Sequence, residues 1–355
     1  MTRRRTGRGI GGLGRSNLTG PRGWITLAVM LVALGFYVAD RRNKPPPPTG
    51  AQTTESRTES RGSDVAPATP QQPPPPTAPP GSTPRPSVAV ASASPQLFLG
   101  NPSDARPDPN VRNNFLLVRA QYALSFNDEK GTANWVSWRL RSADMGDAPR
   151  PRLFQPDPLL PPRFFRAASR DYSNSGFDRG HLCPNSDRDA TVEMAEETFF
   201  LTNIIPQSPN VNQRSWAMLE VYTRKLAENG NNTLFVVAGP NGRGGSGTKG
   251  QADSIARGRI TVPAEVWKVI VVVPTAMAGD PALVGPNVRV IAVRVPNDES
   301  LTTLEWAGFR TSVADIEKAT GLRFFTNLRA EVADALRKKT DTQVIPVPET
   351  PRYLR

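Results

Sequence analysis

The only histidine of the chain, His181, lies in the stretch Asp178-Arg179-Gly180-His181. An imidazole near its own pKa can take a proton from water at neutral pH, which few other side chains can do. Asp178 and Arg179 place a carboxylate and a guanidinium beside this ring, and Gly180 allows the backbone to pack closely. A lone histidine is more often structural than catalytic, so from this chemistry alone both roles stay open.

A second polar cluster follows, and it contains Asn203, Asn212, Glu220 and Arg224. Cleavage of a phosphodiester needs a base that activates water, a cation that neutralises the phosphate oxygens, and rigid donors for flanking phosphates. A chain with one Cys and one His cannot build a zinc site from several such ligands. Mg²⁺ remains, because it accepts one or two protein oxygens and keeps several waters. We therefore interpret the two stretches as halves of one metal-dependent site that cuts phosphodiesters.

Asn203 and Asn212 are the candidate amide ligands, and Glu220 is a candidate for holding metal-bound water. On an ideal helix Asn212 and Glu220 would be about 12 Å apart along the axis, so one of them should act through water. Glu220 and Arg224 are four residues apart, a spacing that also permits a plain surface ion pair. That structural interpretation of the pair stays open beside the catalytic one.

The elements that must position these residues form a mixed α+β pattern around one central sheet. Apolar, β-branched runs bounded by Gly and Pro predict strands, and apolar residues at helical spacing predict helices. The expected strands are 115–126, 134–140, 234–238, 267–273 and 288–293; the expected helices are 192–201, 210–228, 311–319 and 324–337; residues 141–176 are expected to be loop.

A glycine-rich run covers residues 242–250. It lacks the Gly-Lys-Ser/Thr ending of a phosphate-binding P-loop. We predict a mobile loop here, whose Arg and Lys side chains could still touch a nucleic-acid backbone.

Net charge and cysteine content exclude little. The formal net charge is +12, but residues 1–95 hold 12 basic and 4 acidic residues, so most of the excess lies in the N-terminal arm. The high pI is therefore weak evidence for nucleic-acid binding by the folded part. The single cysteine, Cys183, excludes an intrachain disulfide. We expect Cys183 to be a packing residue, with a redox-sensitive role as the alternative.

Residues 24–40 form a weakly polar to apolar run between an arginine-rich segment, 1–23, and Arg41 and Arg42. The run is short for a bilayer span, which takes about 20 residues. We expect an uncleaved signal anchor, with the N-terminus cytoplasmic and the rest of the chain outside the cytoplasm. A cleaved signal followed by secretion, and a buried helix of a soluble protein, are the alternatives.

Residues 41–96 are rich in Pro, Ser, Thr, Ala and Gln. They contain too little apolar surface to offset the entropy of ordering, so we expect a disordered linker. Proline keeps such a chain extended, which favours a spacer that extends the domain away from the membrane. A ligand for proline-binding modules is the alternative, since the run contains PxxP matches.

Several motifs together resemble the DNA/RNA non-specific endonucleases, the family that includes mitochondrial endonuclease G. The run from Asp178 to Asp187 resembles the family's DRGH motif, and the segment from Leu201 to Glu220 resembles its second motif in order and spacing. The similarity covers roughly residues 97–330. It implies a ββα-metal, or His-Me finger, fold, in which a β-hairpin carries the histidine and a following helix carries the metal ligand.

The resemblance also implies roles for individual residues. His181 would be the general base, Asn212 the direct Mg²⁺ ligand, and Glu220 would act on the ion through water. The residues around the scissile phosphate would be Arg179, Arg224, Asn203 and, less securely placed, Arg152, for which Arg150 is the nearby rival. The activity implied is cleavage of DNA and RNA with Mg²⁺, or Mn²⁺ as a substitute, giving 5′-phosphate ends.

The expected segments are a basic tail at 1–23, a transmembrane signal anchor at 24–40, the linker at 41–96, an endonuclease domain at 97–340 and a C-terminal tail at 341–355. The expected partners are DNA and RNA, the membrane through residues 24–40, and a second copy of the chain. Two other functions stay open: a catalytically silent nucleic-acid-binding module of the same fold, and a metal phosphodiesterase that acts on another ester.

Overall fold

The computed structural model describes residues 94–345. The expected basic tail, the anchor and nearly all of the linker lie outside the described residues. Within the described range, none of the helices has the length and apolar character that crossing a bilayer requires.

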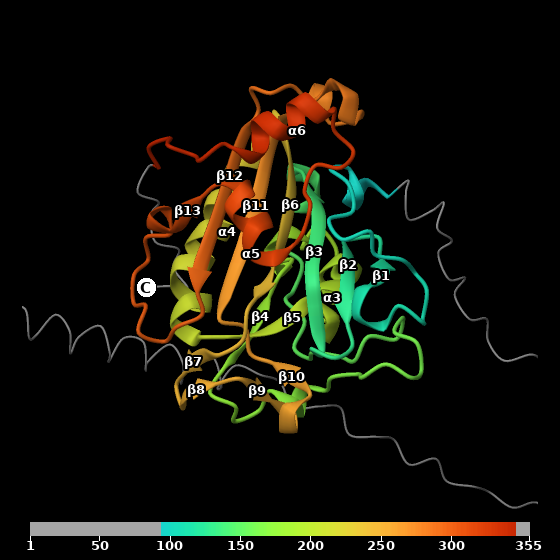
Figure 1. Cartoon of the computed structure of the whole chain (residues 1–355), viewed down its shortest axis with the longest axis vertical. Helices are drawn as coiled ribbons and strands as arrows, with labels where there is room; N and C mark the ends of the chain where they lie inside the picture. The colour runs from blue at the N-terminus through green and yellow to red at the C-terminus, as the bar shows by residue number, and fades with distance from the viewer. Residues whose placement is uncertain (1–93, 346–355) are drawn as a thin grey trace, which may run out of the picture. The chain divides into compact units, whose positions relative to one another are not determined.

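A seven-stranded sheet forms the centre of the fold, and every pair of neighbouring strands in it is antiparallel (Figure 1). The order of the strands is β1-β2-β3-β6-β11-β12-β13. Their bounds are β1 Phe115–Val118, β2 Ala123–Asn127, β3 Thr132–Leu140, β6 Asn232–Asn241, β11 Glu265–Pro274, β12 Arg289–Pro296 and β13 Arg310–Thr311.

Both faces of this sheet are covered, so its central strands are apolar on both sides. Alternate residues of β11 show this: Val266 and Ile270 belong to one hydrophobic cluster, and Val269 and Val271 to the other. The β-branched runs that predicted buried strands in the sequence are therefore confirmed.

The helices divide between the two faces. Their bounds are α3 Val192–Thr198, α4 Ala217–Ala227, α5 Val313–Thr320 and α6 Ala330–Arg337. Leu219 of α4 packs in one cluster, whereas Ile316 of α5 and Leu336 of α6 pack in the other. Figure 1 accordingly shows α5 in front of the sheet and α4 behind it. Helix α4 thus shares its face of the sheet with the elements that carry the polar motifs.

Three small antiparallel pairs lie outside the main sheet. They are β4 Asp178–His181 with β5 Ile204–Gln207, β7 Gly245–Gly247 with β8 Gly250–Ala252, and β9 Ser254–Ile255 with β10 Ile260–Thr261. The glycine-rich run, expected to be an irregular loop, therefore contains a short hairpin, β7–β8. Figure 1 shows β7 to β10 grouped at the end of the domain below β4 and β5.

One expected strand, 115–126, is two strands joined by a turn. β1 ends at Val118 and β2 begins at Ala123, and the N–H of Arg119 donates to the carbonyl of Tyr122 (2.9 Å). This turn lacks Gly, Pro and Asn, so no local signal marks it in the sequence. It is held by distant contacts instead, since the Tyr122 hydroxyl donates to the carbonyl of Glu197 (2.8 Å).

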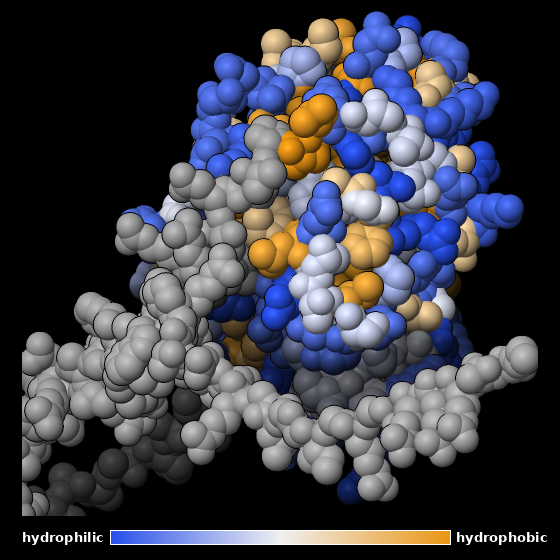
Figure 2. Space-filling view, turned by 90° about the vertical axis from the view of Figure 1, so that its left-hand side faces the viewer, coloured by the Kyte–Doolittle hydropathy of each residue, from blue (hydrophilic) through white to orange (hydrophobic). Residues whose placement is uncertain are grey.

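The expected boundary between the domain and its C-terminal tail, at residue 340, is followed directly by a residue that packs into the domain. Asp341, the first residue of the expected C-terminal tail, is buried and pairs with Arg289 of β12. The face seen in Figure 2 is mostly hydrophilic where described residues are visible, and its hydrophobic residues form small separate groups. Such groups are ordinary on a folded surface.

Candidate active site

The strand pair β4–β5 positions His181. His181 ends β4 and lies opposite Ile204, which begins β5. The strands approach closely because Gly180 has no side chain: a Cβ there would lie 2.2 Å from Oε1 of Gln207, which is fully buried. The glycine of the motif is thus explained by close packing beside the histidine.

The imidazole of His181 packs against two aromatic rings. Its centroid lies 5.4 Å from that of Phe154 and 4.9 Å, edge-on, from that of Phe199. Burial, and secondarily the positive charge of Arg150, lowers the pKa of His181 to about 3. The ring is therefore neutral at neutral pH, which is the state that a general base requires.

The Nε2 atom of this ring is buried, and no described residue forms a hydrogen bond with it. Buried polar atoms are normally paired, so an unpaired one indicates a functional site or a missing bound group. The free nitrogen is suited to interaction with a water or with a substrate.

Asn212 is joined to the histidine strand through Asp178. Its Nδ2 donates to Oδ2 of Asp178 (2.8 Å), and Nε2 of Gln213 donates to the same oxygen (2.8 Å). Both amides lie in η7, a π-helix at Val211–Trp216 that runs into α4, and π-turns of this kind are frequent at functional sites. No described residue donates to the Oδ1 atom of Asn212, so this oxygen can accept a cation.

Glu220 of α4 lies beside a buried cation. Its Oε1 is 3.5 Å from Nζ of Lys268 in β11, and Lys268 is only 1% exposed. The same ammonium lies 4.3 Å from the ring centroid of Trp216, which supports its charge through a cation–π contact. Burial raises the pKa of Glu220, and Lys268 and Arg224 oppose this. Glu220 therefore interacts with at least two cations, Lys268 and Arg224, and does not form only a surface ion pair with Arg224.

Arg224 pairs with a buried carboxylate behind the site. Its Nη1 lies 3.2 Å from Oδ1 of Asp187, which is 1% exposed. The other oxygen of Asp187 accepts a hydrogen bond from Nε1 of Trp138 (3.0 Å). Asp187 thus fixes the guanidinium of Arg224 relative to the sheet.

Arg179 is partly exposed and is held at its tip. Its Nη2 donates to the carbonyl of Ser169 (2.7 Å) and to Oγ of Ser173 (3.2 Å). Its guanidinium lies 5.6 Å from the centroid of Phe154, which also contacts His181. The structure therefore brings Arg179 and His181 to the same aromatic ring.

Asn203 has a positioning role in this structure, which revises the expectation that it contacts phosphate. It is fully buried, and its Nδ2 donates to the carbonyls of Cys183 and Thr198 (both 2.9 Å). Its Oδ1 accepts from the N–H of Cys183 (2.9 Å). Because both amide hydrogens are used by the backbone, Asn203 fixes the chain that leaves His181.

Arg150 is better placed than Arg152, which sequence reasoning had ranked first. The guanidinium of Arg150 lies 5.0 Å from the ring centroid of Phe199, beside His181. Arg152 is exposed, and no contact joins it to the histidine among the described residues. The structure therefore places Arg150, and not Arg152, against an aromatic ring that contacts His181.

Cys183 is buried, and burial raises the pKa of its thiol far above the usual range. A protonated, inaccessible thiol is unreactive. These observations favour the packing role over the redox-sensitive one.

Sequence reasoning gave no role to Lys268, Asp187, Phe154 or Phe199. Asp187 stood inside the quoted motif, and Lys268 could have been noticed as a lysine within an otherwise apolar strand. The two phenylalanines carried no local signal.

The site fits a cation held mainly through oxygen and water. Among residues 94–345 no group of three or more His, Cys, Asp or Glu side chains is arranged to hold a metal. An amide oxygen from Asn212 and a carboxylate from Glu220, acting through water, are oxygen donors of the kind that Mg²⁺ accepts.

A β-strand pair carrying a histidine, followed by a helix carrying an amide and a carboxylate, is the arrangement of a ββα-type nuclease. The sequence model of the DNA/RNA non-specific endonuclease family matches residues 102–331. The chain therefore belongs to this family, and it is an endonuclease that hydrolyses nucleic acids.

Individual relatives agree with this assignment. A nuclease of Nostoc sp. is 41% identical over 263 residues, which cover 74% of this chain and 90% of the relative. The human mitochondrial nuclease EXOG is 33% identical over 213 residues, 58% of this chain and 56% of that protein. A solved EndoG/EndoGI complex aligns with a TM-score of 0.55 at 22% identity, covering 70% of this chain and 95% of the other, which supports the fold alone.

Proposed function

We propose that this endonuclease depends on Mg²⁺, cuts DNA and RNA with little sequence preference, and uses His181 as its general base. The observation that carries the proposal is the contact between Asn212 and Asp178, because it ties a candidate metal ligand to the strand that ends at His181. The unpaired Nε2 of His181 supplies the second half of the argument.

The residues of the chain divide the work. The neutral ring of His181 takes the proton of the attacking water at Nε2, and Phe154 and Phe199 hold the ring in place. Arg179 and Arg224 bind phosphate oxygens, with their orientation set by Ser169 and Asp187. Preorganised cations of this kind stabilise charge that develops in the transition state.

Asn212 through Oδ1, and Glu220 through water, would hold Mg²⁺, or Mn²⁺ as its substitute. When bound, the ion neutralises charge on the phosphate and favours departure of the leaving oxygen. Lys268 orients the carboxylate of Glu220 from behind.

Plasmid cleavage by the full chain, with Mg²⁺ and with EDTA, tests the proposal. We expect nicking and linearisation with Mg²⁺ and none with EDTA. Equal activity in EDTA would reject the metal dependence, and no cleavage of DNA or RNA under any metal would favour a catalytically silent binding module.

Asn212→Ala should remove most Mg²⁺-dependent cleavage, because it deletes the amide oxygen proposed to bind the ion. Gln213→Ala is the matched control, since Gln213 donates to the same Asp178 oxygen at the same distance. The measurement is the cleavage rate against Mg²⁺ concentration. Equal losses in both variants would mean that Asn212 acts only through Asp178.

The cellular placement is also a proposal. The apolar run at 24–40, with arginines before it, supports a single-pass anchor with the endonuclease domain outside the cytoplasm. Recovery of the intact chain in the soluble fraction, without detergent, would reject the anchor. A homodimer stays a prediction, which sedimentation of the detergent-solubilised chain would test.

A further inference from the structure

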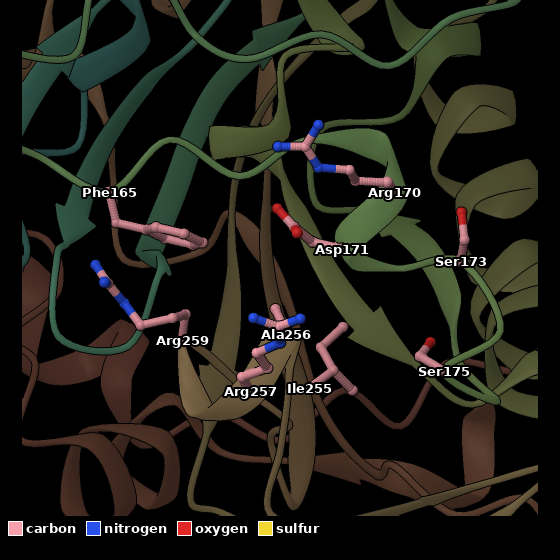
Figure 3. Close-up of a pocket in the computed structure, with 9 residues that line it drawn as sticks. All are labelled: Phe165, Arg170, Asp171, Ser173, Ser175, Ile255, Ala256, Arg257 and Arg259. Atoms are coloured by element: carbon pink, nitrogen blue, oxygen red, sulfur yellow. The ribbon is translucent and has the colours of Figure 1, made fainter.

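A pocket lies beside the candidate active site, between the segment that precedes β4 and the β9–β10 pair. Its volume is about 720 Å³, within the range of ligand-binding pockets. Figure 3 shows Arg170 and Asp171 of η4 (Ser169–Asp171) on one side, with Arg257 of η8 (Ala256–Gly258) across from them. Arg259 and Phe165 lie together at one edge.

The charges of this pocket are unbalanced. Three arginines, Arg170, Arg257 and Arg259, line the pocket together with a single acidic residue, Asp171. Among the residues that the structure describes, neither Arg170 nor Arg257 has a side-chain hydrogen bond or an ion pair. Asp171 already accepts a hydrogen bond from the N–H of Ala168 (2.8 Å). The pocket therefore has a formal excess of two positive charges and unused donors.

The backbone that presents Arg257 is strained. Ala256 and Arg257 have φ values of 53° and 55°, and Gly258 follows at 86°. The left-handed region is unfavourable for a residue other than glycine, because its Cβ comes too close to the following carbonyl oxygen. Strain of this kind persists where the surrounding structure enforces it, and it is enriched at ligand sites.

This pocket shares a wall with the candidate active site. Ser173 lines the pocket, and its Oγ accepts a hydrogen bond from Arg179 (3.2 Å). The carbonyl of Ser169, next to Arg170, accepts from the same guanidinium (2.7 Å). Ile255 of the pocket packs in one hydrophobic cluster with Ile204, the strand partner of His181. A bound strand that leaves Arg179 can therefore continue into the pocket.

We propose that Arg170, Arg257 and Arg259 form a subsite that binds the backbone phosphates of the nucleic-acid strand beyond the cleavage position. Guanidinium groups match phosphate oxygens in a two-pronged geometry and remain charged at every relevant pH. Arg259 lies 4.5 Å from the ring of Phe165, a flat surface on which a neighbouring base can stack. The inference rests on the proposed function and extends its substrate site.

The test replaces the three cations in the full chain with Arg170→Gln, Arg257→Asn and Arg259→Gln. Asparagine is chosen at 257 because it tolerates left-handed backbone. The matched control removes three exposed charges, those of Arg323, Arg329 and Lys338, as Arg323→Gln, Arg329→Gln and Lys338→Gln. Arg329 and Lys338 flank α6, and Arg323 lies in the segment that precedes it. Figure 1 shows α6 at the opposite end of the domain from β9 and β10.

Binding is measured in EDTA, so that no turnover is needed, by fluorescence anisotropy with a 20-nucleotide single strand. We expect the pocket variant to bind about tenfold or more weakly than the parent, and the control to change less than twofold. The slope of log K for binding against log salt concentration should become shallower by about 1 to 2 in the pocket variant. Phosphates that the variant no longer contacts keep their counterions, so fewer ions are released on binding.

Equal affinities and salt slopes for the pocket variant and the control would overturn the inference. If the triple variant melts at a lower temperature than the parent, Arg257→Asn alone, at an exposed side chain, replaces it in the same comparison. Plasmid cleavage separates the two proposals. If the parent cuts plasmid with Mg²⁺ but the pocket variant binds the single strand as tightly as the parent, the proposed function is retained and the phosphate subsite is rejected. A parent that cuts no nucleic acid rejects the function, whatever the binding shows.

Discussion

His181 combines two properties that rarely occur in one imidazole: its Nε2 atom is buried, and this atom has no described partner. Burial holds the pKa near 3, so the free enzyme carries a neutral but weakly basic ring. A phosphate brought beside it would favour the imidazolium and raise that pKa. We therefore expect the base to gain strength when substrate is present.

Replacing the base should abolish most activity without unfolding the protein. We expect His181→Ala to lower the cleavage rate by about 10²–10⁴-fold, the usual contribution of a general base. His181→Phe should be as inactive, although it keeps an aromatic ring packed against Phe154 and Phe199. The measurements are cleavage rate and thermal unfolding. Substantial activity in the Phe variant would reject the proton-transfer role.

Lys268 should support metal binding from behind Glu220. Lys268→Met keeps an unbranched chain against Trp216 but removes the charge beside Glu220. We expect the Mg²⁺ concentration for half-maximal activity to rise about 10- to 100-fold, as is typical when an outer partner of a metal ligand is lost. Lys225→Met, at an exposed lysine of α4, is the control and should leave that concentration unchanged. An unaffected Mg²⁺ requirement in Lys268→Met would mean that Glu220 is oriented without it.

The sequence could nominate candidate site residues within short motifs, and the roles of these residues stay predictions. His181 and Asn212 could be chosen because their types and neighbours carry the chemistry. Arg150 could not be ranked above Arg152, because only the fold brings Phe199 beside His181. The two amides looked alike in sequence, and only burial separates Asn203, which holds backbone, from Asn212.

At the scale of elements, the β4–β5 pair must be unusually tight. Gly180→Ala would drive a methyl group into Gln207. We expect a loss of about 1–3 kcal/mol in the free energy of unfolding, typical of overpacking. Activity should fall by about 100-fold, because a small displacement of His181 is enough. Chemical denaturation and cleavage assays measure the two effects.

Gly279→Ala is the control for that variant, since no atom lies within 4 Å of a Cβ at this position. It should change neither stability nor rate appreciably. Adding Gln207→Ala to Gly180→Ala removes the clashing side chain and should recover part of the activity. If the double variant recovers no activity, the loss in Gly180→Ala comes from a change in the backbone and not from the contact with Gln207.

The strands β6, β11 and β12 could be predicted because each carries a β-branched, apolar run. The turn between β1 and β2 was missed because Tyr122 and Gln121 are fixed by Glu197, about 75 residues away in sequence. The β7–β8 hairpin was missed for the opposite reason. Glycine allows many conformations, and the structure selects one through contacts such as Ser246 Oγ with Asp298 (2.7 Å).

At the scale of the whole described domain, one carboxylate joins three distant segments. Asp341 accepts two hydrogen bonds from Arg289 (2.8 and 2.9 Å) and lies 3.4 Å from Arg310. Arg289 also donates to the hydroxyl of Tyr222 in α4 (2.8 Å). The end of the domain is thereby tied to β12, β13 and α4.

This connection predicts a pH-dependent stability. Burial raises the pKa of Asp341, but the hydrogen bonds and charges of Arg289 and Arg310 outweigh it, so the pKa is lowered. The stabilisation should be present above about pH 4, the ordinary aspartate value, and lost as the pH falls through the lowered one. Asp341→Asn should cost about 1–3 kcal/mol at pH 7. In urea unfolding the difference from the parent should shrink as the pH falls below about 4.

Asp334→Asn controls for loss of a surface charge, since the side chain of Asp334 is 64% exposed. Its effect should stay under about 1 kcal/mol at every pH. A constant penalty for Asp341→Asn across the whole pH range would show that shape, and not charge, holds the segment.

The burial of Cys183 has a practical consequence. The chain has no other cysteine, and this thiol stays protonated and buried. Maleimide dyes should therefore not react with the folded protein. A cysteine introduced at an exposed position such as Ser173 would then be the sole point of attachment. A single fluorophore could in this way report, in real time, when a strand of DNA arrives beside Arg170 and Arg257.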